Sequence, residues 1–383
     1  MTNKIPPKIL LLGSKIDIGG AQRVQLGLAN WLFQRGVDVT CAFFYDPSGQ
    51  FSAWQEKYPF PLVCLHGWKS QGGRLIRALR LAGSWLKLIG WLRDQHISAI
   101  LTFTHDSNLL GLPAAWLAGV PSRYGSHHGR FFSLSAARMC LHAFIINSRM
   151  ADGLVAVSDD TRAQAILEGV QPQRIQVIMN GVEIPAIAEK RSQAIRHELK
   201  MGGKDLLVLN VGRLVAEKGQ QVFIQAAARV LAVFPHVFFA IAGDGPLRGV
   251  LEEQIKMLGT GDRIRLLGSR ADMPDLLAAC NVFVLSSITE GLPMALLEAM
   301  AAGRAVVSTD VGGIRDAVAG GQHALLVPPG DAQGLAEAIM RLIKGTTLRK
   351  DLAAGAQARA REAFSLERMG ERYLALLSGE SMR

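Results

Sequence analysis

Residues 282–303 read VFVLSSITEGLPMALLEAMAAG, which is a short apolar run, a turn, and a longer apolar segment that ends at a glycine. The run from Val282 to Leu285 is typical of a buried strand, and the segment after the turn has the length and apolar spacing of a helix ending at Gly303. Gly291 and Pro293 predict a tight turn between the two, with Pro293 in the first turn of the helix. A strand that passes through a turn into a helix is the repeating unit of a parallel α/β sheet.

The same alternation of strand and helix extends along the chain in both directions. Before the polar stretch 186–204, strand-like apolar runs lie near Ser122 and at 8–13, 37–44, 97–104, 155–158 and 175–178. After it, further runs lie at 206–211, 237–242, 264–267, 305–308 and 324–327. The pattern predicts two doubly wound, Rossmann-like domains with parallel sheets, 1–185 and 186–365, that face a cleft. Such pairs of domains bind ligands at the carboxyl ends of their strands.

The composition is that of a folded protein. The chain has 383 residues, of which 49% are hydrophobic and 19% charged, and this excludes a disordered chain. Its four cysteines lie far apart with no C-x-x-C pair, so neither a structural zinc site nor a disulfide framework is expected. No signal peptide or membrane span is recognisable near the N-terminus. These features lead us to expect a cytoplasmic protein.

Positive charge is confined to the first part of the chain. Residues 1–150 hold 16 Lys and Arg against 6 Asp and Glu, a net charge of +10, whereas the remaining residues are neutral overall. Such a field attracts nucleic acid, anionic lipid or a polyanionic substrate. No helix-turn-helix, zinc-finger or RNA-binding pattern accompanies the charge, so nucleic acid is not the expected partner.

The densest basic stretch runs from Lys69 to Arg93 and predicts a helix. One arc of this helix holds Leu75, Leu79, Ala82, Trp85, Leu86, Ile89 and Leu92. Arg77, Arg80 and Lys87 lie on the opposite side, with Trp91 among them. Two interpretations stay open: a surface helix packed on its own domain, or a patch that binds an anionic membrane surface.

Two glutamates flank the turn and the helix start quoted first. Glu290 lies in the loop, and Glu298 lies just over one turn inside the predicted helix. Free backbone N–H groups at a helix start favour an anion, most simply a phosphate. Carboxylates do not bind phosphate, so the two glutamates are better suited to accept hydrogen bonds from sugar hydroxyls on either side of it.

A second cluster follows the strand-like run 206–211, where residues 212–219 read GRLVAEKG. Arg213 and Lys218 supply two cations at a strand end, and glycine lets the backbone approach a ligand closely. Together with the acidic segment, this cluster predicts a phosphate clamp. Gly243-Asp-Gly245 lacks the third glycine of a dinucleotide fingerprint, and no G-x-x-x-x-G-K-[ST] loop occurs. These absences disfavour a nicotinamide oxidoreductase and a P-loop nucleotidase.

Together these motifs resemble the retaining nucleotide-sugar glycosyltransferases of family 4, also called group 1. The two glutamates separated by seven residues look like that family's signature, and residues 212–219 match its phosphate-binding segment. Gly19-Gly20-Ala-Gln-Arg23 resembles its amino-terminal glycine loop, and Asn180-Gly181-Val182 the segment before the chain crosses between domains. Phe364-Ser365 and the helix after it are similar to a closing helix, 366–383 here, that returns to the first domain.

The resemblance implies the GT-B architecture, with the donor held mainly by the second domain and the acceptor by the first. Arg213 and Lys218 would neutralise the departing diphosphate, Glu298 would accept from ribose hydroxyls, and Glu290 would hold hydroxyls of the donor sugar. The other implied donor-binding positions are Gly19, Gly20, Gly212, Gly268, Gly291, Leu292, Pro293 and Met294. The leaving diphosphate needs charge stabilisation. Since the chain has no Asp-x-Asp pair, we expect no metal and no other cofactor.

Two adjacent histidines stand in Ser126-His-His-Gly129, where the family commonly has a histidine near the donor sugar and the acceptor. We take His128 as the active-site histidine, with His127 as the alternative. His105, at the end of the preceding strand, is a further candidate. Asp159 and Asp160 predict the N-cap of the next helix.

The sequence therefore predicts a retaining, metal-independent hexosyltransferase. It would move a sugar from a nucleotide-sugar, most simply a UDP-sugar, to a lipid-linked or polysaccharide acceptor of a surface glycan such as lipopolysaccharide, capsule or exopolysaccharide. It would be cytoplasmic or peripheral on the inner face of the membrane. Three alternatives stay open: a GT-B epimerase that releases free sugar, an inactive nucleotide-binding scaffold, and a basic nucleic-acid binder. The scaffold is disfavoured because Arg213, Lys218, Glu290 and Glu298 are all present.

Overall fold

The computed structural model describes residues 7–16, 19–47, 49–65, 74–129, 135–184 and 189–379, with the side chains of 74–78 and 189–191 left out. The chain divides into two compact units. Unit 1 is Met1–Gly181 together with Leu366–Arg383, and unit 2 is Val182–Ser365. The chain therefore passes between the units twice, at residues 181–182 and again at 365–366.

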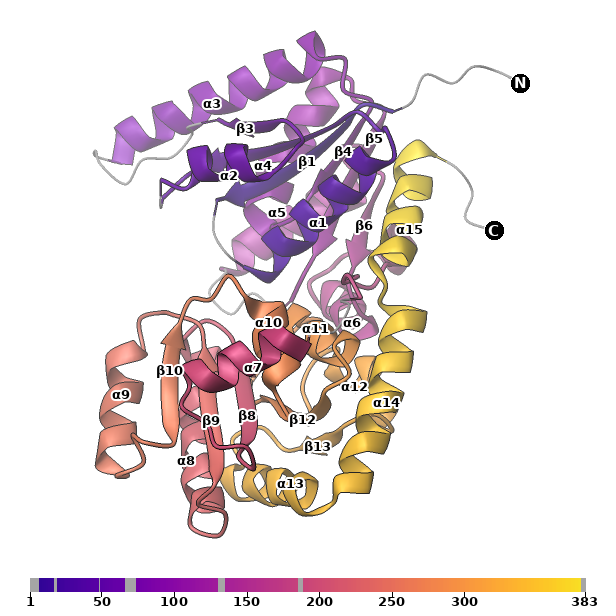
Figure 1. Ribbon diagram of the computed structural model, residues 1–383. Coiled ribbons are helices and arrows are strands. Elements are labelled where there is room, and N and C mark those ends of the chain that lie inside the picture. The colour runs from indigo at the N-terminus through magenta and orange to yellow at the C-terminus, as the bar shows by residue number, and fades with distance from the viewer. Residues whose placement is uncertain are drawn as a thin grey trace. The chain divides into compact units, whose positions relative to one another are not determined.

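Unit 1 is built on a seven-stranded parallel sheet with strand order β3-β2-β1-β4-β5-β6-β7 (Figure 1). The strands are β1 Ile9–Lys15, β2 Val39–Tyr45, β3 Leu62–Cys64, β4 Ala99–Thr102, β5 Ser122–His127, β6 Gly153–Ala156 and β7 Ile175–Val177. The first four residues of β1 are fully buried, as expected of a central parallel strand with helices on both faces.

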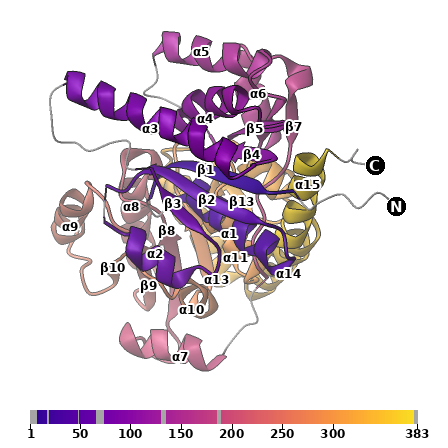
Figure 2. The same cartoon turned by 90° about the horizontal axis from the view of Figure 1, so that it is seen from above.

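The helices of unit 1 lie on both faces of its sheet. They are α1 Gly20–Gln34, α2 Phe51–Lys57, α3 Arg74–Asp94, α4 His105–Ala118, α5 Ala136–Asn147, α6 Asp159–Leu167 and α15 Leu366–Ser378. Seen from above, α3, α4 and α5 lie on one side of β1 and β2, with α1 on the other (Figure 2).

Unit 2 repeats the plan with six parallel strands in the order β10-β9-β8-β11-β12-β13. The strands are β8 Leu206–Val211, β9 Val237–Ala242, β10 Ile264–Gly268, β11 Val282–Leu285, β12 Ala305–Thr309 and β13 Leu325–Val327. The helices are α7 Glu189–Glu198, α8 Gln220–Leu231, α9 Arg248–Met257, α10 Met273–Ala279, α11 Met294–Ala301, α12 Ile314–Ala317, α13 Ala332–Lys344 and α14 Thr346–Ala363. Two doubly wound parallel-sheet domains are thus confirmed.

The last helix, α15, belongs to unit 1 because it packs on α1. Tyr373 on α15 is fully buried, and Trp31 on α1 donates its indole N–H to Glu367 Oε2 at 3.0 Å. Arg35 forms an ion pair with the same carboxylate and lies over the Trp31 ring, 3.9 Å from its centroid. These contacts tie the end of the chain to its first helix.

The predicted apolar arc of α3 is buried only in part. Trp85, Ile89 and Leu92 pack into the apolar cluster under the helix as expected, but other members of the arc do not. Leu79 and Leu86 are 64% and 63% exposed and share the solvent-facing side with Arg80 and Lys87. The side chain of Arg77, and residues 69–73, lie outside the described part of the chain. Trp91, which we placed on the basic side, instead packs against the apolar cluster under the helix.

Side-chain hydrogen bonds help to explain which side of α3 is buried. Ser84 is buried and donates its hydroxyl to the Leu65 carbonyl at 3.2 Å, and Trp85 donates its indole N–H to the Leu110 carbonyl at 2.7 Å. These bonds allow a polar serine to occupy the packed side beside Leu88 and Leu92. Among the described residues, no helix is long and apolar enough to cross a bilayer.

Two predicted helix starts also differ by one residue. Pro293 is the N-cap of α11 with an extended backbone, rather than a residue of its first turn. Ser158, not Asp159 or Asp160, is the N-cap of α6, because its hydroxyl accepts from the Thr161 backbone N–H. The two aspartates occupy the first helical turn, where their charge favours the helix dipole.

Candidate active site

The carboxyl ends of β8 and β11 bring a lysine and a glutamate from distant motifs into contact. Lys218 Nζ lies 2.6 Å from Glu290 Oε1, and the same carboxylate oxygen accepts from Ser287 Oγ at 2.7 Å. The two side chains of the ion pair are 23% and 8% exposed. The sequence predicted both residues for the site but did not predict their pairing.

The loop that carries Lys218 is fixed to the loop that carries Glu290 through the backbone. Gly219 has φ +61°, and a Cβ there would collide with the Ser286 carbonyl oxygen. Ser286 Oγ donates to the Lys218 carbonyl at 3.0 Å, and the Ile288 N–H donates to the Glu217 carbonyl at 2.8 Å. Only glycine combines this backbone conformation with so close an approach, so Gly219 sets the position of the lysine.

A third loop supports Glu290 from the other side. The Gly313 N–H donates to the Gly291 carbonyl at 2.7 Å, and a Cβ on Gly312 (φ +56°) would collide with the Glu290 carbonyl oxygen. Thr309, the last residue of β12, donates its hydroxyl to the Ser287 carbonyl at 2.6 Å. The loops that follow β8 and β12 therefore both hold the loop after β11 that carries Glu290.

Arg213, the second predicted cation, has a more exposed side chain than Lys218. Its side chain is exposed and makes no ion pair with any residue that the structure describes, while its carbonyl accepts from Gln220 Nε2 at 2.9 Å. The adjacent Gly212 is held by β9, because its N–H donates to the Ala242 carbonyl at 3.0 Å. A free guanidinium on a fixed backbone is available to an anionic ligand.

The remaining donor-binding candidates of unit 2 lie at the same sheet edge. Gly268 ends β10 with φ +70°, and its carbonyl accepts from the Gly243 N–H at 2.8 Å. Leu292, Pro293 and Met294 are buried at the start of α11. Glu298 lies farther along α11 and is half-buried.

In unit 1, the predicted glycine loop forms the start of α1. Gly19 is the N-cap with an extended backbone, and Gly20 is the first helical residue and is exposed. A Cβ on Gly19 would meet the Gln22 side-chain oxygen at 2.5 Å.

The two adjacent histidines have different environments. His127 is fully buried, and its Nε2 lies 3.1 Å from Glu168 Oε2, whose side chain is 4% exposed. His128, one residue beyond β5, is only partly buried, and its Nε2 lies 3.0 Å from Ser126 Oγ. His127 is thus committed to an internal partner, which leaves His128 as the histidine that a ligand can reach.

Two further histidines are buried behind this strand. The rings of His105 and His142 lie 4.8 Å apart, and Asn108 Nδ2 lies 2.9 Å from His142 Nε2. Burial and neighbouring charged groups lower the pKa of His105 to about 4 and that of His142 to about 3. Both rings are therefore neutral at physiological pH, and His105 is placed for packing rather than for ligand contact.

Sequence reasoning missed Ser287, Glu168, Asn108 and His142. Each becomes visible only when the sheet brings separate loops together. For Ser287, the spacing of three residues from Glu290 in one loop is the sole local signal.

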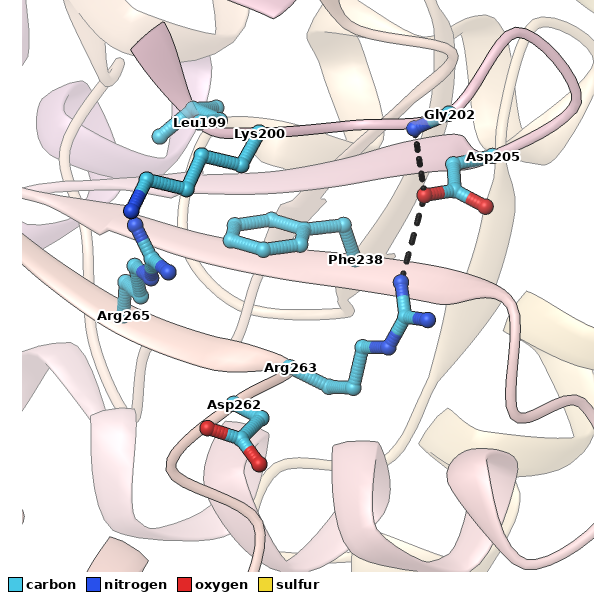
Figure 3. Close-up of a pocket in the computed structure, with 8 residues that line it drawn as sticks. All are labelled: Leu199, Lys200, Gly202, Asp205, Phe238, Asp262, Arg263 and Arg265. Atoms are coloured by element: carbon cyan, nitrogen blue, oxygen red, sulfur yellow. Dashed lines mark hydrogen bonds and ion pairs between the residues drawn. The ribbon is translucent and has the colours of Figure 1, made fainter.

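Two pockets lie away from these side chains. One, of about 420 Å³, opens at the amino-terminal edge of the unit 2 sheet, with Lys200 and Arg265 near Phe238 and Asp205 bonded to Arg263 at 3.2 Å (Figure 3). That is the edge opposite the one where parallel sheets bind ligands. The other, of about 490 Å³, lies at the carboxyl ends of β1 and β2. Its apolar lining comes from β2, α3 and α4.

No three His, Cys, Asp or Glu side chains gather closely enough to hold a metal ion within the ranges that the structure describes. Metal independence stays a prediction.

Two family models match nearly successive parts of the chain. "Glycosyltransferase Family 4" matches residues 18–184, and "Glycosyl transferases group 1" matches residues 191–359. The first match falls within unit 1, apart from its last three residues, and the second falls within unit 2.

Relatives and solved structures agree with these models. The UDP-Gal:alpha-D-GlcNAc-diphosphoundecaprenol alpha-1,3-galactosyltransferase of Escherichia coli is 28% identical over 279 residues, which are 70% of this chain and 72% of that protein. The lipopolysaccharide core biosynthesis glycosyltransferase LpsE of Rhizobium meliloti is 36% identical over 174 residues, 45% of this chain and half of that protein. Crystal structures of Anabaena Alr3699/HepE with UDP and with UDP-glucose match 97% of this chain with TM-score 0.84 and 26% and 25% identity, over 100% and 99% of those chains.

Proposed function

We propose a specific reaction for this chain, which belongs to the GT-B glycosyltransferases. It transfers a hexose from a UDP-sugar to a lipid-linked or polysaccharide acceptor in the synthesis of a surface glycan. The observation that carries the proposal is the convergence of Lys218, Glu290 and Ser287 at the strand ends of unit 2.

This arrangement suits a sugar diphosphate. Arg213 is exposed and forms no ion pair with the described residues, so its guanidinium can bind phosphate oxygens without first breaking one. The ion pair with Glu290 orients Lys218. A diphosphate would compete with Glu290 for the lysine ammonium group, while the Ser287 hydroxyl continues to donate to the Glu290 carboxylate. Both cations then stabilise the charge that develops as the glycosidic bond breaks. Glu290 holds donor-sugar hydroxyls, and Glu298 holds those of the ribose.

UDP is the nucleotide that the comparisons favour. The Anabaena structures, similar in fold and about one quarter identical in sequence, are complexes with UDP and with UDP-glucose. We further propose that no metal is required, since two cations serve the diphosphate, and that the anomeric configuration is retained, as the family resemblance implies.

The acceptor is proposed to bind unit 1. The name of the Escherichia coli relative specifies a diphosphoundecaprenol-linked acceptor, and that of the Rhizobium relative specifies lipopolysaccharide core synthesis. The apolar pocket at the ends of β1 and β2 includes Tyr45, Leu81 and Leu110 and has the Asp106–Arg138 ion pair among its lining residues. An amphiphilic acceptor fits such a mixed surface.

A donor screen tests the proposal. The full chain is incubated with UDP-, GDP- and ADP-hexoses, and nucleotide release, free sugar and transfer to a short-chain lipid-diphosphate sugar are measured. We expect UDP-hexose consumption that is stimulated by the acceptor, with the product anomer read by NMR. UDP at a hundred times its dissociation constant should add about 2.7 kcal/mol to stability. Acceptor-independent release of an epimerised free sugar would instead identify an epimerase, and binding of no nucleotide would refute the proposal.

A further inference from the structure

A hydrogen-bond chain determines which ring nitrogen of His128 carries its proton. Ser126 Oγ lies 2.8 Å from the Thr102 carbonyl oxygen and 3.0 Å from His128 Nε2. A carbonyl oxygen only accepts, so the single hydroxyl proton of Ser126 points to Thr102. The serine oxygen can then only accept from the histidine, and Nε2 is therefore the protonated nitrogen. In a neutral ring this leaves Nδ1 as an acceptor.

The serine is itself held rigidly. Ser126 and Thr102 are fully buried, and Asn108 is 1% exposed. Thr102 Oγ1 donates to Asn108 Oδ1 at 2.5 Å, and Asn108 Nδ2 donates to the Ser126 carbonyl at 3.1 Å. Because β4, α4 and β5 each supply one member, the position of the serine does not depend on any single loop.

The remaining contacts of His128 leave Nδ1 available. The ring stacks on Phe103, with centroids 5.7 Å apart and planes 24° apart. Nδ1 makes no hydrogen bond with any residue in the described ranges, and it is not among their buried unpartnered polar atoms. Burial, and the charge that His127 can carry, lower the pKa of His128 to about 3, so the ring stays neutral at physiological pH.

We propose that Ser126 is a positioning residue that holds His128 as the Nε2–H tautomer, so that Nδ1 accepts a hydrogen bond from a hydroxyl group of a sugar substrate. This inference rests on the proposed function and deepens it. Because the His128 ring is neutral, it does not serve as a cation that stabilises the diphosphate. The ring is also too weakly basic to act as a strong general base. Its role in this proposal is to select and orient a substrate hydroxyl group.

Tautomer state is measured directly by long-range ¹H–¹⁵N NMR on the full chain with ¹⁵N-labelled histidine. The His128 signals are identified by their loss in His128→Asn. We expect Nε2 to be protonated and Nδ1 to be unprotonated at pH 7, and Ser126→Ala to shift His128 toward a mixture of tautomers while the His142 signals stay unchanged. A protonated Nδ1 in the wild type, or an unchanged tautomer in Ser126→Ala, would overturn the proposal.

Two replacements of His128 test the role of Nδ1. The Asn amide places its polar atoms near the position of Nδ1, whereas the Gln amide reaches the position of Nε2 and leaves nothing at Nδ1. We expect His128→Asn to keep about tenfold more kcat/KM than His128→Gln, the worth of one hydrogen bond. Equal losses, or the reverse order, would contradict the proposal.

Failure of this inference is distinguishable from failure of the proposed function. The NMR result needs no activity, so it decides the tautomer even if no sugar is transferred. Conversely, UDP-dependent stabilisation and transfer in the wild type would stand with either tautomer. Should Ser126→Ala fail to fold, the wild-type spectrum and the two His128 variants still decide the question.

Discussion

Lys218 and Glu290 form an ion pair in the structure. This pair couples the two proposed roles, phosphate binding by Lys218 and sugar binding by Glu290. The ion pair neutralises a carboxylate that is 8% exposed, and Ser287 donates to the same oxygen. Removing the lysine would therefore leave a largely buried charge with one neutral donor, in addition to removing the proposed phosphate contact. Arg213 has no such partner within the described part of the chain, so its loss would remove only the proposed ligand contact.

We predict unequal effects for the two cations. Arg213→Ala should lose about 10- to 100-fold in kcat, because a charge-assisted hydrogen bond that strengthens in the transition state contributes about 1.5–3 kcal/mol. Lys218→Ala should lose at least as much and should also unfold at a lower temperature. Steady-state UDP-sugar turnover and thermal unfolding measure both effects, with the exposed Lys204→Ala as the control and EDTA added to each sample. Full activity of both variants would show that neither cation serves the diphosphate, and inhibition by EDTA would contradict metal independence.

Glu298→Gln should separate binding from chemistry. A ribose contact is equally strong in the ground and transition states, so its loss should raise the donor KM more than it lowers kcat. The matched comparison is Glu290→Gln. Glu290 pairs with Lys218 and is proposed to contact the reacting sugar, so this variant should lower kcat. Initial rates over a range of donor concentrations give both parameters. An unchanged donor KM for Glu298→Gln would show that Glu298 does not contact the donor.

His142 makes unit 1 sensitive to acid. Burial and its neighbours His105 and His127 lower the pKa of His142 to about 3, against a partly opposing effect of Glu168. The unfolded chain binds a proton below about pH 6.5 that the folded chain does not, so the stability is present above that pH and is lost as pH falls. At pH 5 this one site costs up to about 2 kcal/mol.

His142→Gln should keep an acceptor for Asn108 and remove the titration. Its unfolding free energy should therefore fall less than that of the wild type between pH 7.5 and pH 5, as measured by urea denaturation. The control is His96→Asn, at an exposed residue of the same unit whose positive φ asparagine tolerates. Equal acid sensitivity of His142→Gln and wild type would argue against this account.

At the scale of the element, α3 shows how far helical periodicity can be trusted. The alternation of apolar and polar residues predicted a helix that ends near Arg93, and α3 ends at Asp94. It predicted the buried face only in part, because leucines lie on two sides of the helix: Leu79 and Leu86 are exposed, whereas Leu88 is buried. The buried Ser84 lies beside Leu88 because its hydroxyl donates to the Leu65 carbonyl. A local pattern contains no information about such a partner, which comes from a different segment of the chain.

The corrected face of α3 changes the membrane proposal. Leu79 and Leu86 lie with Arg80 and Lys87 on the exposed side, so apolar and basic side chains point the same way. A helix that lies in a membrane interface uses both kinds: apolar side chains enter the acyl boundary and basic ones meet anionic headgroups. The net charge of +10 in residues 1–150 favours the same surface.

We predict that two double variants of α3 weaken membrane binding. Arg80→Gln with Lys87→Gln should reduce sedimentation with phosphatidylglycerol vesicles by about 30-fold, at about 1 kcal/mol for each charge. Leu79→Gln with Leu86→Gln should reduce it independently of salt. Phosphatidylcholine vesicles serve as the control, and UDP-sugar hydrolysis should stay unchanged in both variants. If both double variants bind phosphatidylglycerol vesicles as well as the wild type does, α3 is an ordinary solvent-exposed helix without a role in membrane binding.

At the scale of the whole molecule, the sequence predicted the two-domain architecture but did not predict the side-chain pairs that join distant segments. Strand–turn–helix repeats are local, so two doubly wound sheets follow from them, and the glycines at 212, 219 and 291 mark strand ends that the sheets bring to one edge. The pairing of Lys218 with Glu290 joins residues 72 apart, and that of His127 with Glu168 residues 41 apart. Such pairings depend on strand order, which the local pattern leaves open.

The return of the chain to unit 1 through α15 depends on one small residue. A Cβ on Gly370 would collide with the Trp31 ring, whereas a Cβ on the half-buried Gly83 of α3 would meet nothing within 4 Å. Gly370→Ala should therefore cost about 1–3 kcal/mol through overpacking, despite the better helix propensity of alanine. Gly83→Ala should be stabilising by about 0.5–1 kcal/mol.

Hydrogen exchange on the full chain resolves where the cost of Gly370→Ala falls. Because α15 packs within unit 1, we expect faster exchange in peptides of α1 and α15 and unchanged exchange in β8 and β11. UDP should still slow exchange around Lys218, since the clamp lies wholly within unit 2. Exchange that rises equally in both units would show that the two units unfold as one, and unchanged exchange in α1 would show that Trp31 can move aside.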